Sequence, residues 1–452
     1  IKYDSEGKEL WREAYDGGGR DEAYVVAVDS DGNIVVTGLS FNGKNNDYCT
    51  IKYDSEGKEL WREAYDGGSD DQATGVAIDS QNNIIVTGFP DDGSTTNYYT
   101  IKYNPNGDEI WHKVYDSLST LSEEAVASGD GSKKEFTLKH FPVIPESETI
   151  YLGDQAQKRD TDYTIANDTG TITFAVAPEA GVAITADYTV HGNDCAQEVA
   201  VDSDDNIIVT GSSIGLEEGA TWYSCTIKYD SDGKEVWAEP ATYHGIYEGK
   251  ARSVTAFGAA ADSQGNVITT VSYYTPAYLE DSTIHPRKYN RYITIKYGKD
   301  DGQELWSEPI IYDGGKDYDC AYDVIVDSGD NIIVTGCSGG DYCTIKYNGT
   351  DGSQFAGWTT NPVTYDGGQW DSALDVAVDA NNNIIVTGSS QRNLGAGEAA
   401  GGGLSTGAVV GIAIGGCAAI GLAYLYLVYL RERPVPRAER RRRAAKQRKK
   451  AA

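Results

Sequence analysis

The chain has 452 residues and a formal net charge of −31 at pH 7. A surface this acidic repels nucleic acid and anionic lipid, so we expect neither as a partner of the folded part. The charge is unevenly distributed along the chain. Residues 431–452 hold eight arginines and three lysines against two glutamates, a net charge of +9, which leaves about −40 for the remainder.

Two linked sequence signatures repeat along the chain. The first is IKYDSEGKELWREAYDGG, which occupies residues 1–18 and returns unchanged at residues 51–68. Looser copies keep a Thr-Ile-Lys-Tyr segment whose last residue is Tyr103, Tyr229, Tyr297 or Tyr347. The second is V-A-V-D-S-x-x-N-I-I-V-T-G, whose copies end at Gly38, Gly88, Gly211, Thr270, Gly336 and Gly388. A repeat of about 50 residues is typical of a radial or stacked array.

Each repeat has the composition of four β-strands. In residues 33–37 the β-branched side chains dominate and Gly, Asn and Asp bound the segment, which favours extended backbone. Turns such as residues 29–33 supply the Asp side chain and the glycine that tight hairpins require. We therefore predict strands A to D of the first repeat at residues 23–29, 33–39, 48–53 and 59–65. Four antiparallel strands in about 50 residues predict one propeller blade.

The two ends of the repeat region carry complementary half-blades. The chain opens with a C–D pair at residues 1–15 and ends its repeats with an A–B pair at residues 371–389. The simplest fold is an all-β propeller of six four-stranded blades, built from residues 1–116 and 193–390. Its last blade would combine both ends of the chain and so remove the open sheet edges. Because Ile1 starts inside a strand and the chain contains no methionine, we expect further sequence upstream, with seven blades as the alternative.

The signatures T-I-K-Y-D-x-x-G-x-x-x-W and V-A-V-D-S-x-x-N-I-I-V-T-G resemble the SBBP-type β-propeller repeats of bacterial and archaeal surface and secreted proteins. The resemblance covers residues 1–116 and 194–389. It implies a propeller, usually of seven blades in that family, and says little about function. Residues 7–11 (Gly-Lys-Glu-Leu-Trp) are also similar to the tryptophan-docking motif of quinoprotein and outer-membrane-assembly propellers. That similarity implies that the blade tryptophans pack between neighbouring blades.

Residues 117–192 interrupt the repeat between strand D of one blade and strand A of the next. Short alternating segments such as residues 149–152 and 171–174 predict a small inserted β-sandwich. The D–A and B–C connections of a four-stranded blade leave from one face of the ring, which we call the loop-rich face. The B–C loops vary in length, and the one at residues 272–291 carries four tyrosines. Such a face is typical of protein or glycan contacts, although exposed loops also vary without function.

The C-terminal region departs from the repeats. Residues 391–407 form a Gly/Ala-rich linker, and residues 408–430 contain no charged side chain. A helix of that length, at about 1.5 Å per residue, would cross a hydrocarbon core, and the basic residues 431–452 predict a cytoplasmic tail. We therefore expect a plasma-membrane protein with its propeller outside the cell. Gly411 and Gly415 have a spacing that allows two such helices to pair as a homodimer.

We assign no catalytic, cofactor-binding or metal-ligating residue from the sequence. The five histidines lack metal-ligand spacing, and no nucleophile or phosphate-binding motif is present. Residues 29–33 and 202–206 (Asp-x-Asp-x-Asn) partly resemble calcium loops, but hairpin turn chemistry explains them better. Among the seven cysteines, Cys337 and Cys343 are the best candidates for a disulfide, with isolated buried thiols as the alternative.

These patterns favour a membrane-anchored extracellular β-propeller that acts as an adhesion, scaffold or ligand-binding module and not as an enzyme. The expected partners are cell-surface proteins or glycans, bound on the loop-rich face. One alternative is an extracellular polysaccharide hydrolase or lyase that uses carboxylates of this face. Another is a structural subunit of a surface layer that self-assembles, with Ca²⁺ as a weakly indicated cofactor.

Overall fold

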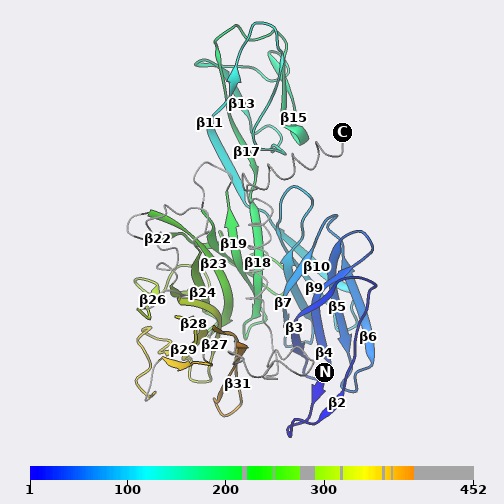
Figure 1. Cartoon of the computed structure of the whole chain (residues 1–452), viewed down its shortest axis with the longest axis vertical. Helices are drawn as coiled ribbons and strands as arrows, with labels where there is room; N and C mark the ends of the chain where they lie inside the picture. Colours follow the sequence, from blue (N-terminus) through cyan, green and yellow to red (C-terminus); the bar gives the residue numbers. More distant parts are fainter. Residues whose placement is uncertain are drawn as a thin grey trace, which may run out of the picture. The chain divides into compact units, whose positions relative to one another are not determined.

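The computed structural model describes residues 1–390, apart from 216–220, 248–249, 275–290, 316–318, 359–361 and 368–369 (Figure 1). Within these ranges the regular elements are strands and one short 3₁₀-helix, η1 (Asn167–Thr169), so the all-β prediction is confirmed. No helix in this part of the chain has the length and apolar character needed to cross a membrane. The predicted linker, membrane span and basic tail, residues 391–452, lie outside the described residues.

Five complete blades repeat one antiparallel sheet, with strands A to D hydrogen-bonded in order. Blade 1 consists of β3 (Asp21–Val28), β4 (Ile34–Phe41), β5 (Asn46–Tyr53) and β6 (Glu59–Tyr65). Blade 2 consists of β7 (Gln72–Ile78), β8 (Ile84–Phe89), β9 (Tyr98–Tyr103) and β10 (Glu109–Tyr115). Blade 3 consists of β18 (Asn193–Val201), β19 (Ile207–Ile214), β20 (Tyr223–Tyr229) and β21 (Ala241–Tyr243).

The remaining two complete blades follow the same order. Blade 4 consists of β23 (Lys250–Ala261), β24 (Val267–Tyr274), β25 (Tyr292–Tyr297) and β26 (Ile310–Tyr312), with β22 (Gly245–Tyr247) added beside β23. Blade 5 consists of β27 (Asp319–Val326), β28 (Ile332–Ser338), β29 (Asp341–Tyr347) and β30 (Val363–Tyr365). The A strands of consecutive blades contact one another, which gives the propeller-like arrangement.

The hydrophobic core lies between blades because consecutive B-strand residues point to opposite faces of the sheet. Val35 of blade 1 shares one buried cluster with Ile84 and Val86 of blade 2. Ile85 of blade 2 in turn shares a cluster with Ile207 and Val209 of blade 3. Each B strand is therefore covered on both faces, which explains the continuous Ile-Ile-Val runs in the repeat.

Tryptophan docking joins one blade to the next. The indole Nε1 of Trp61 donates a hydrogen bond to the carbonyl oxygen of Pro105 in the following blade at 3.0 Å. The Trp61 ring covers Gly107, which has a φ of 94° and where a Cβ atom would lie 2.9 Å from the ring. Trp111 and Trp237 make the same bond to the next blade, so the predicted packing of tryptophans between blades is confirmed.

The two ends of the described chain form separate two-stranded sheets. One is β1 (Lys2–Tyr3) with β2 (Glu9–Trp11), and the other is β31 (Asp371–Val378) with β32 (Ile384–Ser390). The blade predicted to combine both ends is not formed in this structure, and the closed six-bladed or seven-bladed ring stays a prediction.

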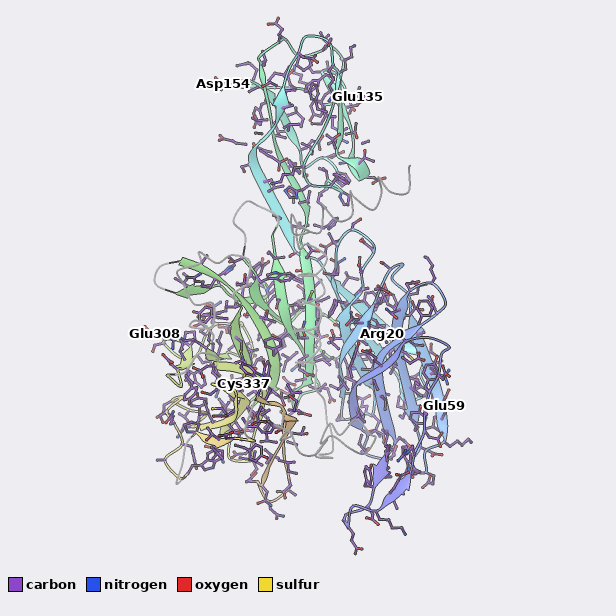
Figure 2. The ribbon with its side chains drawn as sticks, in the orientation of Figure 1. Arg20, Glu59, Glu135, Asp154, Glu308 and Cys337 are labelled. Carbon is purple, nitrogen blue, oxygen red and sulfur yellow. The ribbon has the colours of Figure 1, made fainter. Side chains whose placement is uncertain are left out.

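The insertion consists of two sheets that enclose a core of their own. One sheet contains β11 (Leu118–Ser128), β17 (Ala183–His191), β13 (Thr149–Leu152) and β14 (Gln155–Ala156). The other contains β12 (Glu135–Thr137), β16 (Thr171–Phe174) and β15 (Tyr163–Ala166). Phe136, Ile150, Ile172 and Tyr188 are buried between them. Glu135 and Asp154 lie on the outside of this region, as Glu59 does on blade 1, whereas Cys337 is buried among strands (Figure 2).

Candidate functional site

The loop-rich face is assembled by backbone hydrogen bonds between D–A connections and the ends of B–C loops. These bonds run from Asp71 N to Asn46 O (2.7 Å), from Asp194 N to Thr96 O (2.8 Å) and from Asp371 N to Gly340 O (2.7 Å). The insertion joins this face, since Gly192 N donates to Ser117 O at 2.7 Å across its base. The prediction that both kinds of connection share one face with the insertion is confirmed.

One sequence motif recurs at the blade junctions of this face. It consists of Tyr-Asp-Gly-Gly followed by an aspartate at the start of the next A strand. In residues 65–71, the carboxylate of Asp71 accepts a hydrogen bond from the backbone N–H of Gly67 at 2.5 Å. Gly68 follows with a φ of 112°, a conformation that glycine adopts without strain. The same bond forms at Asp21, Asp319 and Asp371. This site is not among the residues predicted from the sequence, although the recurrence of the motif is a signal that could have located it.

Burial raises the pKa of two of the aspartates at these junctions, Asp71 and Asp194. Asp71 is 0% exposed, and burial raises its pKa to about 7, although the backbone N–H groups of Gly67 and Asp91 oppose the shift. Asp194 occupies the same position at the next junction, and burial raises its pKa to about 6. These carboxyl groups are therefore partly protonated near neutral pH.

At two junctions a third carboxylate completes a cluster. Asp47, Asp66 and Asp71 each offer an oxygen, and these atoms lie within 4.8 Å of one another. A corresponding cluster joins Asp341, Asp366 and Asp371 between blade 5 and β31. Asp47 and Asp341 occupy the same position, five residues before the lysine of strand C. We call these two groups the junction clusters.

The junction between blades 4 and 5 shows how the chain neutralises the same site by itself. Arg291 stands there in the position of Asp47, and its guanidinium forms an ion pair with Asp313. That ion pair holds the pKa of Asp313 below its ordinary value. At the junction between blades 2 and 3, His191 Nδ1 lies 2.5 Å from a carboxylate oxygen of Asp116. At these two junctions, which lack the third aspartate, an arginine or a histidine faces the junction carboxylate.

The junction clusters have the donor set that a hard cation prefers, several carboxylate oxygens in a small space. The same oxygens would also accept the ammonium or guanidinium group of a ligand. At the first cluster the side-chain amide of Asn42 donates to both oxygens of Asp47, at 2.9 and 2.8 Å. Asp66 and Asp366 are exposed, so a ligand can reach each cluster from solvent.

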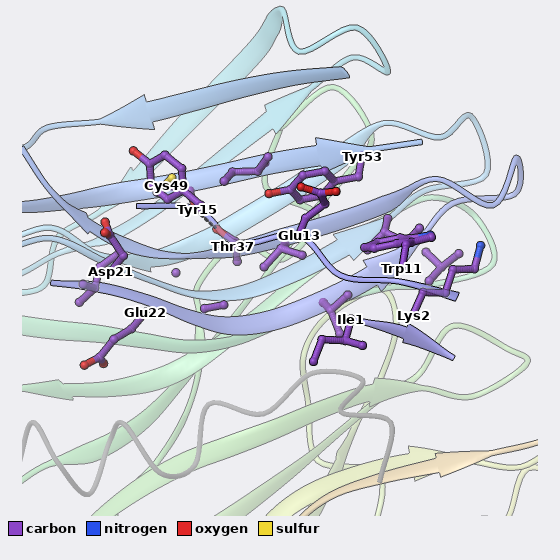
Figure 3. A pocket seen from close by; sticks show the side chains of 18 of the residues that line it. Ile1, Lys2, Trp11, Glu13, Tyr15, Asp21, Glu22, Thr37, Cys49 and Tyr53 are labelled. Atoms are coloured by element: carbon purple, nitrogen blue, oxygen red, sulfur yellow. Dashed lines mark hydrogen bonds between the residues drawn. The ribbon is translucent and has the colours of Figure 1, made fainter. Parts of the chain in front are cut away.

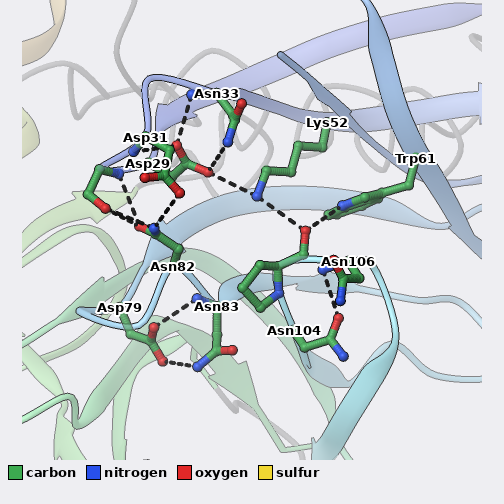
Figure 4. Close-up of polar contacts among 12 residues, drawn as sticks. Asp29, Asp31, Asn33, Lys52, Trp61, Asp79, Asn82, Asn83, Asn104 and Asn106 are labelled. Atoms are coloured by element: carbon green, nitrogen blue, oxygen red, sulfur yellow. Dashed lines mark hydrogen bonds and ion pairs between the residues drawn. The ribbon is translucent and has the colours of Figure 1, made fainter. Parts of the chain in front are cut away.

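The turns that resemble calcium loops hold a lysine instead. One carboxylate oxygen of Asp29 lies 2.9 Å from Lys52 Nζ and 2.8 Å from the side-chain amide of Asn33 (Figure 4). The other oxygen accepts the backbone N–H groups of Asp31 and Asn33. This arrangement returns at Asp202 with Lys228 and Asn206. The interpretation of these segments as hairpin turns is confirmed, and the carboxylates of Asp29 and Asp202 are already bonded within their own blades.

A further set of perturbed carboxyl groups lies on the A strands, at the bulges. Burial raises the pKa of Glu198 to about 8, with Asp323 as the next cause. Burial and the carboxylate of Asp323 also raise the pKa of Asp375. Asp323 links blade 5 to β31, since it accepts the backbone N–H of Val376 at 2.8 Å. No local pattern in the sequence indicates this group, because two blades and the β31–β32 sheet contribute its members.

Two sequence predictions about side chains need correction. Tyr273, expected in an exposed tyrosine-rich loop, is buried in β24 and donates its hydroxyl to Ile246 O at 3.0 Å. The rest of that loop, residues 275–290, lies outside the described residues. Cys337 pairs in the sheet with Cys320 on the neighbouring strand and not with Cys343. The six cysteines of the described chain are all buried.

Neither a protein-family model nor a curated protein matches this sequence. The solved structures that resemble this chain include the following three, each with a TM-score of 0.38. A protein of unknown function from Bacteroides caccae is 10% identical over 80% of this chain and 88% of its own. A PL25 polysaccharide lyase, an ulvan lyase, is 11% identical over 78% and 71%. A mutant of the NanB sialidase from Streptococcus pneumoniae is 11% identical over 84% and 67%.

Likenesses at these TM-scores carry no argument about function. The propeller-like fold rests on the strands and contacts described above.

Proposed function

We propose that this chain is a ligand-binding β-propeller whose loop-rich face holds a cell-surface protein or glycan. The supporting observation is the pair of junction clusters, each with three carboxylates within 4.8 Å and one exposed member. Carboxyl groups this close repel one another when they are ionised, and a bound cation relieves that repulsion. The clusters therefore favour a ligand that is cationic, or one whose hydroxyl or carboxylate groups reach the face through Ca²⁺.

The cellular setting belongs to the same proposal. Residues 408–430 would anchor the chain in the plasma membrane, with the propeller outside and residues 431–452 in the cytoplasm. Pairing of two such helices would bring two binding faces together and raise avidity for a repetitive surface. The repeats also support membership of the SBBP-type propellers, the family that the two signatures resemble.

The enzymatic alternative, a polysaccharide hydrolase or lyase, depends on the same carboxylates. A general acid needs a raised pKa and access to the substrate. Asp71 has a raised pKa, but it is 0% exposed and its oxygens accept the N–H groups of Gly67 and Asp91. This geometry keeps a substrate away from the Asp71 carboxyl group and so disfavours proton transfer by Asp71.

A panel experiment tests the proposal. The purified full chain is applied to arrays of surface glycans and surface proteins, in CaCl₂ and in chelator. The double variant Asp47→Asn/Asp341→Asn should lose binding, whereas Asp154→Asn, at an exposed carboxylate of the insertion, should keep it. Binding that survives in the double variant would contradict the proposal.

The same panel separates the alternatives. Glycan turnover that is lost in Asp66→Asn would favour the enzyme. Ordered self-assembly without binding to any panel member would favour a surface-layer subunit.

A further inference from the structure

Two cysteines of blade 5 lie directly opposite each other on neighbouring strands. Cys320 on β27 pairs with Cys337 on β28, and both side chains are buried. Directly paired residues of an antiparallel sheet have Cα atoms about 4.5–5.5 Å apart and side chains on the same face. A disulfide needs a Cα separation of roughly 4.4–6.8 Å. The register of the sheet therefore places these two sulfur atoms where a disulfide can form.

Cys343 does not have this relationship with Cys337. It pairs with Gly336, the neighbour of Cys337 on β28. Since consecutive residues of a strand point to opposite faces of the sheet, the side chains of Cys337 and Cys343 lie on opposite faces. Cys320 is therefore the geometric partner of Cys337.

The two thiols of the pair interact in the structure. The Cys320 thiol forms a hydrogen bond with Cys337, and this contact is the main cause that lowers the pKa of Cys337 from its ordinary value of 9.0. The hydroxyl groups of Tyr322 and Ser372 act in the same direction, and Tyr322 Oη lies 4.0 Å from Cys337 Sγ. Burial instead raises the pKa of Cys343 to about 12. Cys337 therefore has more thiolate character than Cys343, and the thiolate is the form that attacks a disulfide.

Blade 5 differs from the other described blades in having cysteine at both of these positions. Blade 3 comes closest, with Cys195 opposite Ser212. The corresponding pairs of the remaining A–B hairpins contain no cysteine, and they are Glu22–Leu39, Gln72–Phe89, Thr255–Ser272 and Ser372–Ser389. Blade 3 thus provides a single buried cysteine in the same sheet position as a control.

Cys49 of blade 1 provides a second comparison, at the strand-C position of Cys343. Its partners in the sheet are Gly38 and Ala64. It also lines the cavity between blade 1 and the β1–β2 hairpin, as Tyr15 does (Figure 3). Among the described residues that line this cavity Cys49 is the one cysteine, so we expect it to remain a thiol.

The cysteine pair of blade 5 lies at the end of the hairpin that reaches the loop-rich face. One residue after Cys337 the chain turns through Gly339 and Gly340, which have φ values of 61° and 89°. Gly340 O accepts the backbone N–H of Asp371, a member of the second junction cluster. A bond between the two sulfur atoms would therefore hold together the strand ends next to this turn.

We propose that Cys320 and Cys337 form a disulfide when the chain folds in an oxidising compartment, with a small-molecule disulfide as the oxidant. The Cys337 thiolate attacks one sulfur of the oxidant, which breaks the S–S bond of the oxidant, forms a mixed disulfide and releases one thiol. The Cys320 thiolate then attacks the sulfur of Cys337, which forms the bond between the strands and releases the second thiol. The two protons lost by the cysteines end on the two released thiols, and two electrons pass from the cysteines to the oxidant.

Burial determines when this exchange can occur. Cys337 is 0% exposed and Cys320 is 7% exposed. The exchange therefore precedes the packing of blade 5, and the folded sheet then keeps reductants away from the bond. Because the disulfide restricts the chain between the two cysteines in the unfolded state, it raises Tm. This effect is independent of any ligand on the loop-rich face.

Refolding of the full chain tests the proposal. One sample is refolded in a mixture of reduced and oxidised glutathione and another in a strong reductant, and the remaining thiols of both are alkylated after denaturation. Peptide mass spectrometry should find Cys320 joined to Cys337 in the first sample, with Cys49 alkylated in both. The first sample should also have the higher Tm.

Two alanine variants separate this bond from the general effect of removing a buried sulfur. Cys320→Ala should lose both the crosslink and the difference in Tm between the oxidised and reduced samples. Cys195→Ala, at the same strand position in blade 3, should keep both. Ser212→Cys creates the blade 5 arrangement in blade 3 and should add a second crosslink, to Cys195.

Three results would overturn the proposal. One is alkylation of both Cys320 and Cys337 in the oxidised sample of a folded chain, and another is a crosslink from Cys337 to Cys343. The third is a difference in Tm that survives in Cys320→Ala. A folded Ser212→Cys variant without the second crosslink would contradict the geometric argument.

Discussion

The indole N–H of Trp237 donates a hydrogen bond to the carbonyl oxygen of Lys299 in the next blade at 3.1 Å. The two residues are 62 positions apart, and the Trp237 side chain is almost fully buried. The same bond is made by Trp11, Trp61 and Trp111, so in these repeats one side chain fixes the position of the following turn. Substitution of Trp237 should therefore show how much the contact between blades contributes to the free energy of unfolding.

Removal of the bond and of the ring should have separable effects. Trp237→Phe keeps most of the ring and should cost about 1 kcal/mol of unfolding free energy for the lost hydrogen bond. Trp237→Ala should cost about 3–5 kcal/mol because a cavity remains. Urea unfolding measures both values. Equal losses in the two variants would show that the ring makes no packing contribution.

The glycine under the ring provides a matched pair. A Cβ atom at Gly302 would lie 2.9 Å from the Trp237 ring, whereas Gly7 has a similar φ, 79° against 68°, with open space around it. Both Ala variants carry backbone strain of order 1 kcal/mol. Gly302→Ala should lose more, and thermal unfolding would detect the difference. Equal shifts in Tm would contradict the docking account.

The buried ion pairs should be sensitive to loss of one partner. Lys228→Met leaves Asp202 buried without its cation and should cost about 3–5 kcal/mol at pH 7. The matched control is Lys234→Met in the following turn. Lys234 is exposed, so this substitution should change stability by less than about 0.5 kcal/mol. Urea unfolding compares the two variants, and similar losses would show that the buried pair has no special weight.

The pKa of Asp202 predicts how the stability contributed by the Asp202–Lys228 ion pair changes with pH. Burial raises the pKa of Asp202, but the hydrogen bonds from Lys228 and Asn206 outweigh it, so the pKa lies below the ordinary value of 3.8. A carboxylate with a lowered pKa stabilises the fold above its unfolded pKa, and this contribution is lost as the pH falls through the folded pKa. The cost of Lys228→Met should therefore be greatest near neutral pH and smaller in acid. A cost that grows in acid would contradict this sign.

The contribution of Glu198, which lies at the bulge of β18, to the stability of the fold should change with pH in the opposite direction. Burial raises its pKa from 4.5 to about 8. The protonated form stabilises the fold fully below pH 4.5, and this contribution is lost as the pH rises towards 8. Glu198→Gln should therefore gain roughly 1–4 kcal/mol relative to the wild type at pH 9, with little change at pH 4. Urea unfolding at both pH values measures the difference.

Calcium should stabilise the fold through the junction clusters. A ligand present at 100 times its Kd adds about 2.7 kcal/mol of stability, which raises Tm. Asp47→Asn/Asp341→Asn should abolish the shift produced by CaCl₂. Asp313→Asn should keep it, because Arg291 already occupies that junction. A shift that persists in the double variant would assign the calcium effect to other residues.

Strand positions followed closely from the repeat. The predicted strand at residues 59–65 coincides with β6 (Glu59–Tyr65), and those predicted at 23–29 and 48–53 each begin two residues late relative to β3 and β5. The repeat also indicated the tryptophan contacts. Both features depend on local alternation and on residues repeated in every blade, which a single sequence displays.

The candidate site was less accessible to sequence reasoning. Asp47 and Asp71 lie 24 positions apart and meet only because a B–C loop bonds to the following D–A connection. The opposition of Cys320 and Cys337 depends on the pairing of β27 with β28, whose register shifts at a bulge after Ala321. Such relationships come from register and blade contact, which no local pattern encodes.

The most direct test of the central claim is a hydrogen-exchange footprint of the full chain with and without its best ligand from the panel. Binding on the loop-rich face predicts slower exchange in residues 42–47, 66–71 and 366–367, with unchanged exchange in the turns at residues 30–33 and 55–58. Slower exchange in those turns, with no change at the junction clusters, would place the ligand on the opposite face and contradict the account.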